Sequence, residues 1–281
     1  MAEFLQALQA TDPVAFTIGP FAARWYGLSY LAGFLAATAL AWHFAKKWKL
    51  SLSFDDLLTV LISLSLGVII GSRVGFVLFY QPAYFLANPL QIIAFWDGGI
   101  SGMSFHGGLI GAIIGAYIAA RLIKMPLLRL GDLVLIGTPI GLAFGRLSNY
   151  INGELWGRVT DVSWGVVFPA AAAGDLARHP SQLYEGLLQG VLMFAVLLTI
   201  AIVYARKGRP PVPGTIAGTF LVLYGIVRIF AENFREPDSQ LGFLLGNWLT
   251  MGMLLSLPMV IVGAAILWHA WRNRAKLEDT V

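Results

Sequence analysis

The sequence predicts an all-α integral membrane protein with seven transmembrane helices and a small cap outside the membrane. Of its 281 residues, 58% are hydrophobic and only 12% are charged, whereas about 25% of the residues of a soluble domain are charged. The mean hydropathy is +0.74. This composition excludes both a soluble globular chain and a disordered one.

Seven apolar stretches approach the roughly 20 residues that a helix needs to cross a bilayer. We take the whole chain, residues 1–281, as a single polytopic membrane domain. No positively charged segment precedes the first stretch, so we expect it to be a span and not a cleaved signal peptide. The predicted spans are 22–45, 57–79, 104–123, 132–149, 182–205, 213–232 and 247–271.

The basic residues predict how these spans are oriented. Every lysine lies in one of four alternate segments, and the cytoplasmic segments of membrane proteins carry an excess of Lys and Arg. We therefore expect the N-terminus outside and the C-terminus in the cytoplasm, and we expect no nucleic-acid partner despite the high pI. The four segments carry Lys46, Lys47 and Lys49; Arg121, Lys124 and Arg129; Arg206, Lys207 and Arg209; and Arg272, Arg274 and Lys276.

Two outer segments are longer than a simple connection requires. Residues 80–103 are rich in aromatic side chains and have no Lys or Arg, which is typical of an arm lying at the membrane interface. Residues 150–181 carry Trp156 and Trp164. We interpret them as a small outer cap and not as a disordered loop, because these aromatic side chains need packing or lipid.

Three predicted spans repeat glycine at every fourth position, which makes one smooth face on each helix. These faces predict a tightly packed core of the second, third and fourth spans. Such a core brings Arg73, His106 and Arg146 to a similar depth near the outer surface. The glycines are Gly67, Gly71 and Gly75; Gly107, Gly111 and Gly115; and Gly137, Gly141 and Gly145.

Polar residues gather at the predicted outer ends of the spans, while the inner halves are apolar. A charge inside a bilayer usually faces a bundle interior or a wet cavity, although an arginine near a helix end has the alternative of snorkelling to the interface. We therefore expect a cavity that opens to the outer leaflet. The arginines at this level are Arg24, Arg73, Arg146, Arg158, Arg178, Arg228 and Arg235. The other polar residues include Tyr26, Asn149, Asn152, Glu154, His179, Gln182, Glu185 and Glu232.

The residue types of this cavity suit an anionic lipid headgroup. Arginine binds phosphate through paired N–H donors and keeps its charge when buried. His106 opens the third span and is the candidate for proton transfer, while a structural role at the helix start stays open. The chain has no cysteine and no His, Asp and Glu spacing typical of a metal site, so we expect neither a metal nor a cofactor.

Two alternative functions remain at this point. Residues 99–102, Gly-Ile-Ser-Gly, have the form of the GxSG motif of rhomboid-like intramembrane proteases. The later histidines, His179 and His269, are poorly placed to activate that serine. An anionic-lipid transporter or scramblase is the other alternative, but a transport path favours polar groups at the midplane or along its full length.

Residues 145–157, Gly-Arg-Leu-Ser-Asn-Tyr-Ile-Asn-Gly-Glu-Leu-Trp-Gly, closely resemble the signature of bacterial prolipoprotein diacylglyceryl transferases, G-R-x-[GA]-N-F-x-N-x-E-x-x-G. Ser148 and Tyr150 depart mildly from it and leave its polar residues intact. The resemblance covers essentially the whole chain in order. The other segments that resemble this family are 104–111, 179–185 and 235–238.

The resemblance implies a reaction and a location. The family transfers the diacylglyceryl group of phosphatidylglycerol to the lipobox cysteine thiol of a prolipoprotein signal peptide. The products are a thioether and glycerol 1-phosphate. The resemblance also implies seven spans in the membrane lipid of the bacterial cell inner (cytoplasmic) membrane, catalysis at its outer face, and a periplasmic position for the cap at 150–181.

The resemblance further implies that Arg146 and Arg235 bind phosphate, with Asn149 and Tyr26 assisting. His106 is the candidate base, and Glu154 is expected to hold an arginine or the cap. The predicted catalytic residues are Tyr26, His106, Arg146, Asn149, Glu154 and Arg235. The predicted substrate-binding residues are Arg73, Arg146, Asn152, Gly157 and Arg235.

Overall fold

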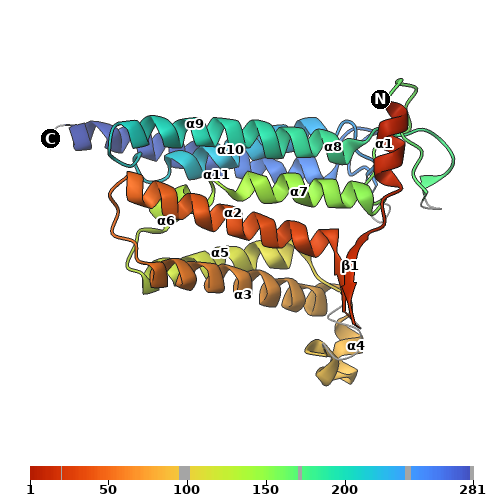
Figure 1. Ribbon diagram of the computed structural model, residues 1–281, viewed down its shortest axis with the longest axis horizontal. Coiled ribbons are helices and arrows are strands. Elements are labelled where there is room, and N and C mark those ends of the chain that lie inside the picture. Colours follow the sequence, from red (N-terminus) through yellow and green to blue (C-terminus); the bar gives the residue numbers. More distant parts are fainter. Residues whose placement is uncertain (20, 95–101, 170–172, 238–241, 279–281) are drawn as a thin grey trace. The chain divides into compact units, whose positions relative to one another are not determined.

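The computed structural model is mostly helical (Figure 1) and describes the whole chain except residues 20, 95–101, 170–172, 238–241 and 279–281. The chain divides into two compact units. Unit 1 comprises residues 1–50 and 132–281, and unit 2 comprises residues 51–131.

Each of the seven predicted spans contains a helix. Five helices are long and apolar enough to cross a membrane, and a sixth span arises if α6 (Leu127–Val134) and α7 (Thr138–Ile151), which meet at an angle of 51°, count as one. The shorter apolar helix α10 (Thr215–Ala231) matches the remaining stretch. These helices support a multi-pass membrane protein, while the number seven stays a prediction. The five are α2 (Trp25–Lys47), α3 (Phe54–Phe79), α5 (Phe105–Leu122), the helix Ser181–Arg206 and α11 (Met251–Glu278).

Helices α3 and α5 of unit 2 pack with their backbones in direct contact. A Cβ atom at Gly67 or Gly71 of α3 would fall within 3.0 Å of backbone atoms of α5. Gly107 and Gly111 of α5 meet α3 in the same way. Small residues allow this close approach between membrane helices. The predicted pairing of the glycine faces of the second and third spans is therefore confirmed.

The glycine face of the fourth predicted span packs against α2, so the prediction that this face packs against the second and third spans is wrong. A Cβ atom at Gly137 would fall within 3.0 Å of Ala37 of α2, and one at Gly33 of α2 would fall equally close to Gly141 of α7. Among the described residues, no atom beyond Gly145's own stretch of helix backbone lies within 4 Å of a Cβ atom placed at Gly145. A smooth face fits any other smooth face, so the glycine period alone does not identify its partner.

Unit 1 holds α6 against the start of α10 through one carboxylate. Asp132 is fully buried, and it accepts hydrogen bonds from the backbone N–H groups of Gly214, Ile216 and Ala217 at 2.9, 2.9 and 3.0 Å. These donors have no partner within their own helix. A negative charge also suits the positive end of the helix dipole.

The N-terminal segment forms structure that the sequence analysis did not predict. Helix α1 (Ala2–Gln9) is followed by the antiparallel hairpin of β1 (Val14–Ile18) and β2 (Phe21–Arg24). The Tyr150 hydroxyl donates to the Leu5 carbonyl at 2.8 Å and thereby ties α1 to the end of α7. In the described residues the fold is thus mostly helical, with one short hairpin near the N-terminus, and not purely α-helical as predicted.

The two predicted outer segments both carry ordered structure in their described residues. Tyr150, Val166 and Phe168 pack together in a buried cluster within the segment 150–181. The arm at 80–103 contains α4 (Pro82–Ala87) and the 3-10 helix η1 (Pro89–Ile92). Its Phe95 and Trp96, and Gly99 to Ser101 of the GxSG motif, lie outside the described residues.

Candidate active site

Three arginines of unit 1 meet at one buried carboxylate. Glu185, the last residue of α8 (Ser181–Glu185), is fully buried. Its Oε2 atom lies 2.8 Å from Nη2 of Arg146 and 2.9 Å from Nη1 of Arg228, and its Oε1 atom lies 3.6 Å from Nη1 of Arg235. A buried charge is tolerated when it is paired. Glu185 therefore draws together arginines from α7, from α10 and from the segment after α10.

A second carboxylate completes this cluster. Glu232 forms an ion pair with Arg228 and accepts a hydrogen bond from the Thr250 hydroxyl at 2.6 Å. The guanidinium of Arg228 is thus shared between two carboxylates. The cluster contains three arginines and two carboxylates, those of Glu185 and Glu232. Its net charge is therefore +1. This excess suits an anionic ligand.

The loop that follows α7 places Glu154 beside Arg146. Oε1 of Glu154 accepts from the side-chain amides of Asn149 at 2.8 Å and Asn152 at 3.2 Å. Oδ1 of Asn149 in turn accepts from Nη1 of Arg146 at 3.5 Å. Leu155, the next residue after Glu154, has a φ of 60°. Left-handed backbone at a residue other than glycine is strained, and such strain is concentrated at functional sites.

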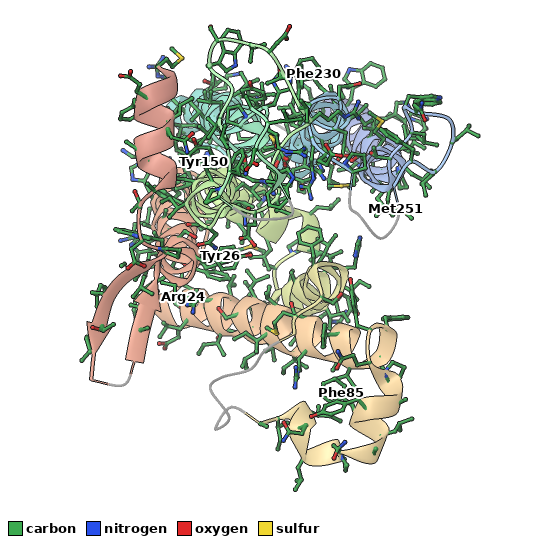
Figure 2. All side chains as sticks on the ribbon, turned by 90° about the vertical axis from the view of Figure 1, so that its right-hand side faces the viewer. Arg24, Tyr26, Phe85, Tyr150, Phe230 and Met251 are labelled. Atoms are coloured by element: carbon green, nitrogen blue, oxygen red, sulfur yellow. The ribbon has the colours of Figure 1, made fainter. Side chains whose placement is uncertain are left out.

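Tyr26 lies in the same unit, at the start of α2 (Figure 2). Its hydroxyl lies 3.0 Å from that of Tyr30, and its side chain is partly exposed. The structure therefore brings together the predicted residues Arg146, Asn149, Asn152, Glu154 and Arg235 through hydrogen bonds and ion pairs, and Tyr26 lies in the same unit.

Gly157 supports the segment that carries Arg235. A Cβ atom at Gly157 would fall within 3.0 Å of the backbone carbonyl oxygens of His179 and Phe234, so only glycine fits where these strands of chain meet. Gly157 and Arg235 also face each other in an isolated β-bridge. Arg158 adds to this support, because its guanidinium donates to the carbonyl of Arg235 at 3.0 Å.

His179 lies beside this junction and is held by aromatic side chains. Its Nδ1 lies 3.2 Å from the hydroxyl of Tyr184, and its ring centroid lies 5.3 Å from that of Phe234. Burial lowers the pKa of His179, and the charge of Asp161 partly opposes this shift. The geometry favours a neutral, structural imidazole.

Arg73 belongs to unit 2, where it is buried and holds the outer arm. It donates to the carbonyls of Gln91 at 2.5 Å, Ile92 at 2.7 Å and Gly102 at 3.2 Å. Its guanidinium also lies 4.9 Å from the centre of the Phe85 ring, which is labelled in Figure 2. This geometry favours anchoring of the arm over the predicted binding of substrate.

His106 is the second residue of α5 in unit 2 and is exposed. The helix begins at Ser104, whose hydroxyl accepts from the N–H of Gly107 at 3.2 Å. The His106 ring lies edge-on to Phe105 with centroids 5.7 Å apart. No described residue forms a hydrogen bond with the imidazole. Its role as a base stays a prediction.

The sequence also matches a known protein family. The family profile described as "Prolipoprotein diacylglyceryl transferase" matches residues 13–269. The chain belongs to the prolipoprotein diacylglyceryl transferase family. The resemblance of residues 145–157 to the signature of this family is thereby confirmed.

Relatives in this family match the chain over nearly its full length. The phosphatidylglycerol–prolipoprotein diacylglyceryl transferase of Brucella anthropi is 46% identical over 275 residues, which cover 94% of each chain. The transferase of the same name from Brucella canis is 47% identical over 284 residues, covering 97% of this chain and 96% of that one. The Brucella ovis transferase is 46% identical with the same coverage.

Glu185 was predicted to lie near the site, but its pairing with three arginines was not predicted from the sequence. A signal for that pairing exists, because a carboxylate within an apolar span requires a cationic partner. Arg228, Glu232 and Arg235 recur at the spacing of one helix face. This spacing does not show that the three arginines share Glu185, which lies on a different helix.

Proposed function

We propose that this transferase moves the diacylglyceryl group of phosphatidylglycerol to the lipobox cysteine thiol of a prolipoprotein signal peptide. The observation that carries the proposal is the cluster around Glu185, whose excess positive charge fits a phosphate. In the reaction a C–S bond forms at the glyceryl carbon as its C–O bond to the phosphate breaks. The thiol loses its proton to a base, and glycerol 1-phosphate leaves. Membership of this family argues against the protease and the transporter alternatives.

Arg146 and Arg235 bind the phosphate in this proposal. Negative charge grows on the phosphate oxygens as the bond breaks, and donors that are already in place stabilise that charge most effectively. Asn149 assists because it links Arg146 to Glu154. Tyr26 completes the site as a hydroxyl donor beside Arg146.

His106 accepts the thiol proton. A thiolate is a far better nucleophile than a thiol, so a base near the attacking sulfur speeds the reaction. The exposure of His106 at the start of α5 supports this role.

The reaction takes place at the outer face of the bacterial inner membrane. The N-terminus and the segment 150–181 lie in the periplasm, and the C-terminus lies in the cytoplasm. Figure 1 supports this orientation within unit 1, because α1 lies at the end of the helices that carries the cluster and the C-terminus lies at the other end. In Figure 1, α2 and α9 end on the side of the C-terminus, and the lysines at 46–49 and Lys207 lie at or just after these ends.

Replacing Arg146 tests the phosphate role. We expect purified Arg146→Ala to lose on the order of 10²-fold or more in rate with phosphatidylglycerol and a lipobox peptide, because a transition-state contact is lost. Arg146→Lys should also fail, since lysine does not reproduce a bidentate contact. Arg209→Ala removes an exposed arginine at the far end of α9 (Met193–Arg206) and is the matched control. Near-normal lipidation by Arg146→Ala would contradict the assignment.

A further inference from the structure

Glu185 has no assigned role in the proposed reaction, yet it pairs with three arginines. One of its oxygens lies within 3.0 Å of both Arg146 and Arg228, and the other faces Arg235 at 3.6 Å. The side chain is fully buried. It therefore acts on the phosphate only through the arginines.

The three arginines are not equivalent in this arrangement. Arg228 is held by Glu185 and by Glu232 at once, so its charge is compensated twice. Arg146 and Arg235 also pair with Glu185. They are the two residues to which the proposed function assigns the phosphate, so Glu185 contacts both phosphate-binding arginines directly.

The helix that carries Glu185 is shaped to hold it. The π-helix η3 (Gly186–Leu192) begins directly after Glu185, and π-helical segments in α-helices are frequent at functional sites. Within it, the amide of Gln189 donates to Oε2 of Glu185 at 3.3 Å. A Cβ atom at Gly190 would fall within 3.0 Å of Ala143 of α7, so this segment lies directly against the helix of Arg146.

We infer that Glu185 is a positioning residue, which holds Arg146 and Arg235 in the geometry that the phosphate requires in the transition state, while Arg228 completes the anchor. Without the carboxylate the three guanidinium groups repel one another and lose their common acceptor. The cluster would still attract an anionic headgroup, because its net charge rises from +1 to +2 when one of its two carboxylates is neutralised. The inference rests on the proposed function.

Glu185→Gln tests this role with the full-length protein in detergent, using phosphatidylglycerol and a lipobox peptide. We expect kcat per folded molecule to fall at least tenfold, while the KM for phosphatidylglycerol changes much less. Glu185→Asp retains the negative charge but has a side chain shorter by one methylene group. We therefore expect the same fall in kcat with a much smaller change in KM. If Glu185→Gln does not fold, kcat and KM are measured on Glu185→Asp instead.

Asp132→Asn is the matched control, because Asp132 is a second fully buried carboxylate of unit 1 that binds the start of α10, whereas Arg228 lies in the last turn of α10 and Arg235 follows it. We expect this variant to lower the thermal midpoint and to leave kcat per folded molecule unchanged. The inference is overturned if kcat of the folded Glu185 variant falls less than tenfold. It is also overturned if the KM for phosphatidylglycerol rises by the same factor as kcat falls.

The same experiment separates this inference from the proposed function. If Arg146→Ala is inactive while Glu185→Gln turns over normally, the arginines bind phosphate without needing Glu185, and only the positioning role is lost. If Arg146→Ala itself turns over normally, the phosphate assignment is lost as well.

Discussion

The imidazole of His106 is exposed at the start of α5 and forms no hydrogen bond with a described residue, so it is available to a substrate thiol. A base works only in its unprotonated form, so activity that depends on His106 should fall as the pH is lowered. If His106 were structural, its replacement would change stability or affinity instead.

We expect His106→Gln to retain the fold and phosphatidylglycerol binding but to lose most turnover at neutral pH. Raising the pH ionises the thiol without help, so part of the loss should be recovered. The measurement is the pH–rate profile of the wild type and the variant with a lipobox peptide. A variant with normal turnover and an unchanged acid limb would show that another group takes the proton, and Arg146 and Arg235 would keep their proposed roles.

Most residues of the candidate site were predictable from the sequence, because the signature places Arg146, Asn149 and Glu154 within one helix and the loop that follows it. The contacts between Asn149, Glu154 and Arg146 then depend on local geometry alone. The role of Glu185 was not predictable in this way. Its pairing with Arg235, fifty residues further along the chain, exists only once α7, α8 and α10 have packed.

At the scale of helices and strands, the positions of the helices follow from hydropathy, whereas their partners and the hairpin do not. Isolated two-stranded hairpins are marginally stable in water, so β1 and β2 depend on contacts beyond their own residues. The indole of Trp25 donates to the Asp12 carbonyl at 3.0 Å just outside the hairpin. The Gln6 side chain bonds the backbone of Val167, 161 residues away. A local sequence pattern does not predict contacts between residues so far apart in the chain.

Two glycine substitutions test the helix pairs that the structure shows. Gly111→Leu places a side chain against the backbone of α3, and Gly33→Leu places one against α7. Overpacking a close contact typically costs about 1–3 kcal/mol, so both variants should melt earlier in detergent. Gly145→Ala is the control, because a Cβ atom there meets open space. If Gly111→Leu melts like that control, α3 and α5 do not pack through their glycines.

Across the whole molecule, the number of spans depends on α10 and on whether the bent pair α6 and α7 forms one span. Its 17 residues extend about 26 Å at 1.5 Å per residue, a little less than the roughly 30 Å of a hydrocarbon core. Local thinning of the bilayer and snorkelling side chains accommodate a short helix. If α10 spans, the segments before and after it lie on opposite sides of the membrane. If the bent pair α6 and α7 also spans once, the total is seven and the termini lie on opposite sides as well.

The chain has no cysteine, so single-cysteine variants label against a clean background. Lys207 precedes α10 and Asn247 follows it, and both are exposed. With a membrane-impermeant maleimide on intact cells whose outer membrane admits the reagent, we expect Asn247→Cys to be labelled and Lys207→Cys to be protected. Both should react once the inner membrane is permeabilised, and both variants should retain transferase activity. Equal labelling of the two positions in intact cells would mean that α10 does not cross, and the basic segments would then not all lie in the cytoplasm.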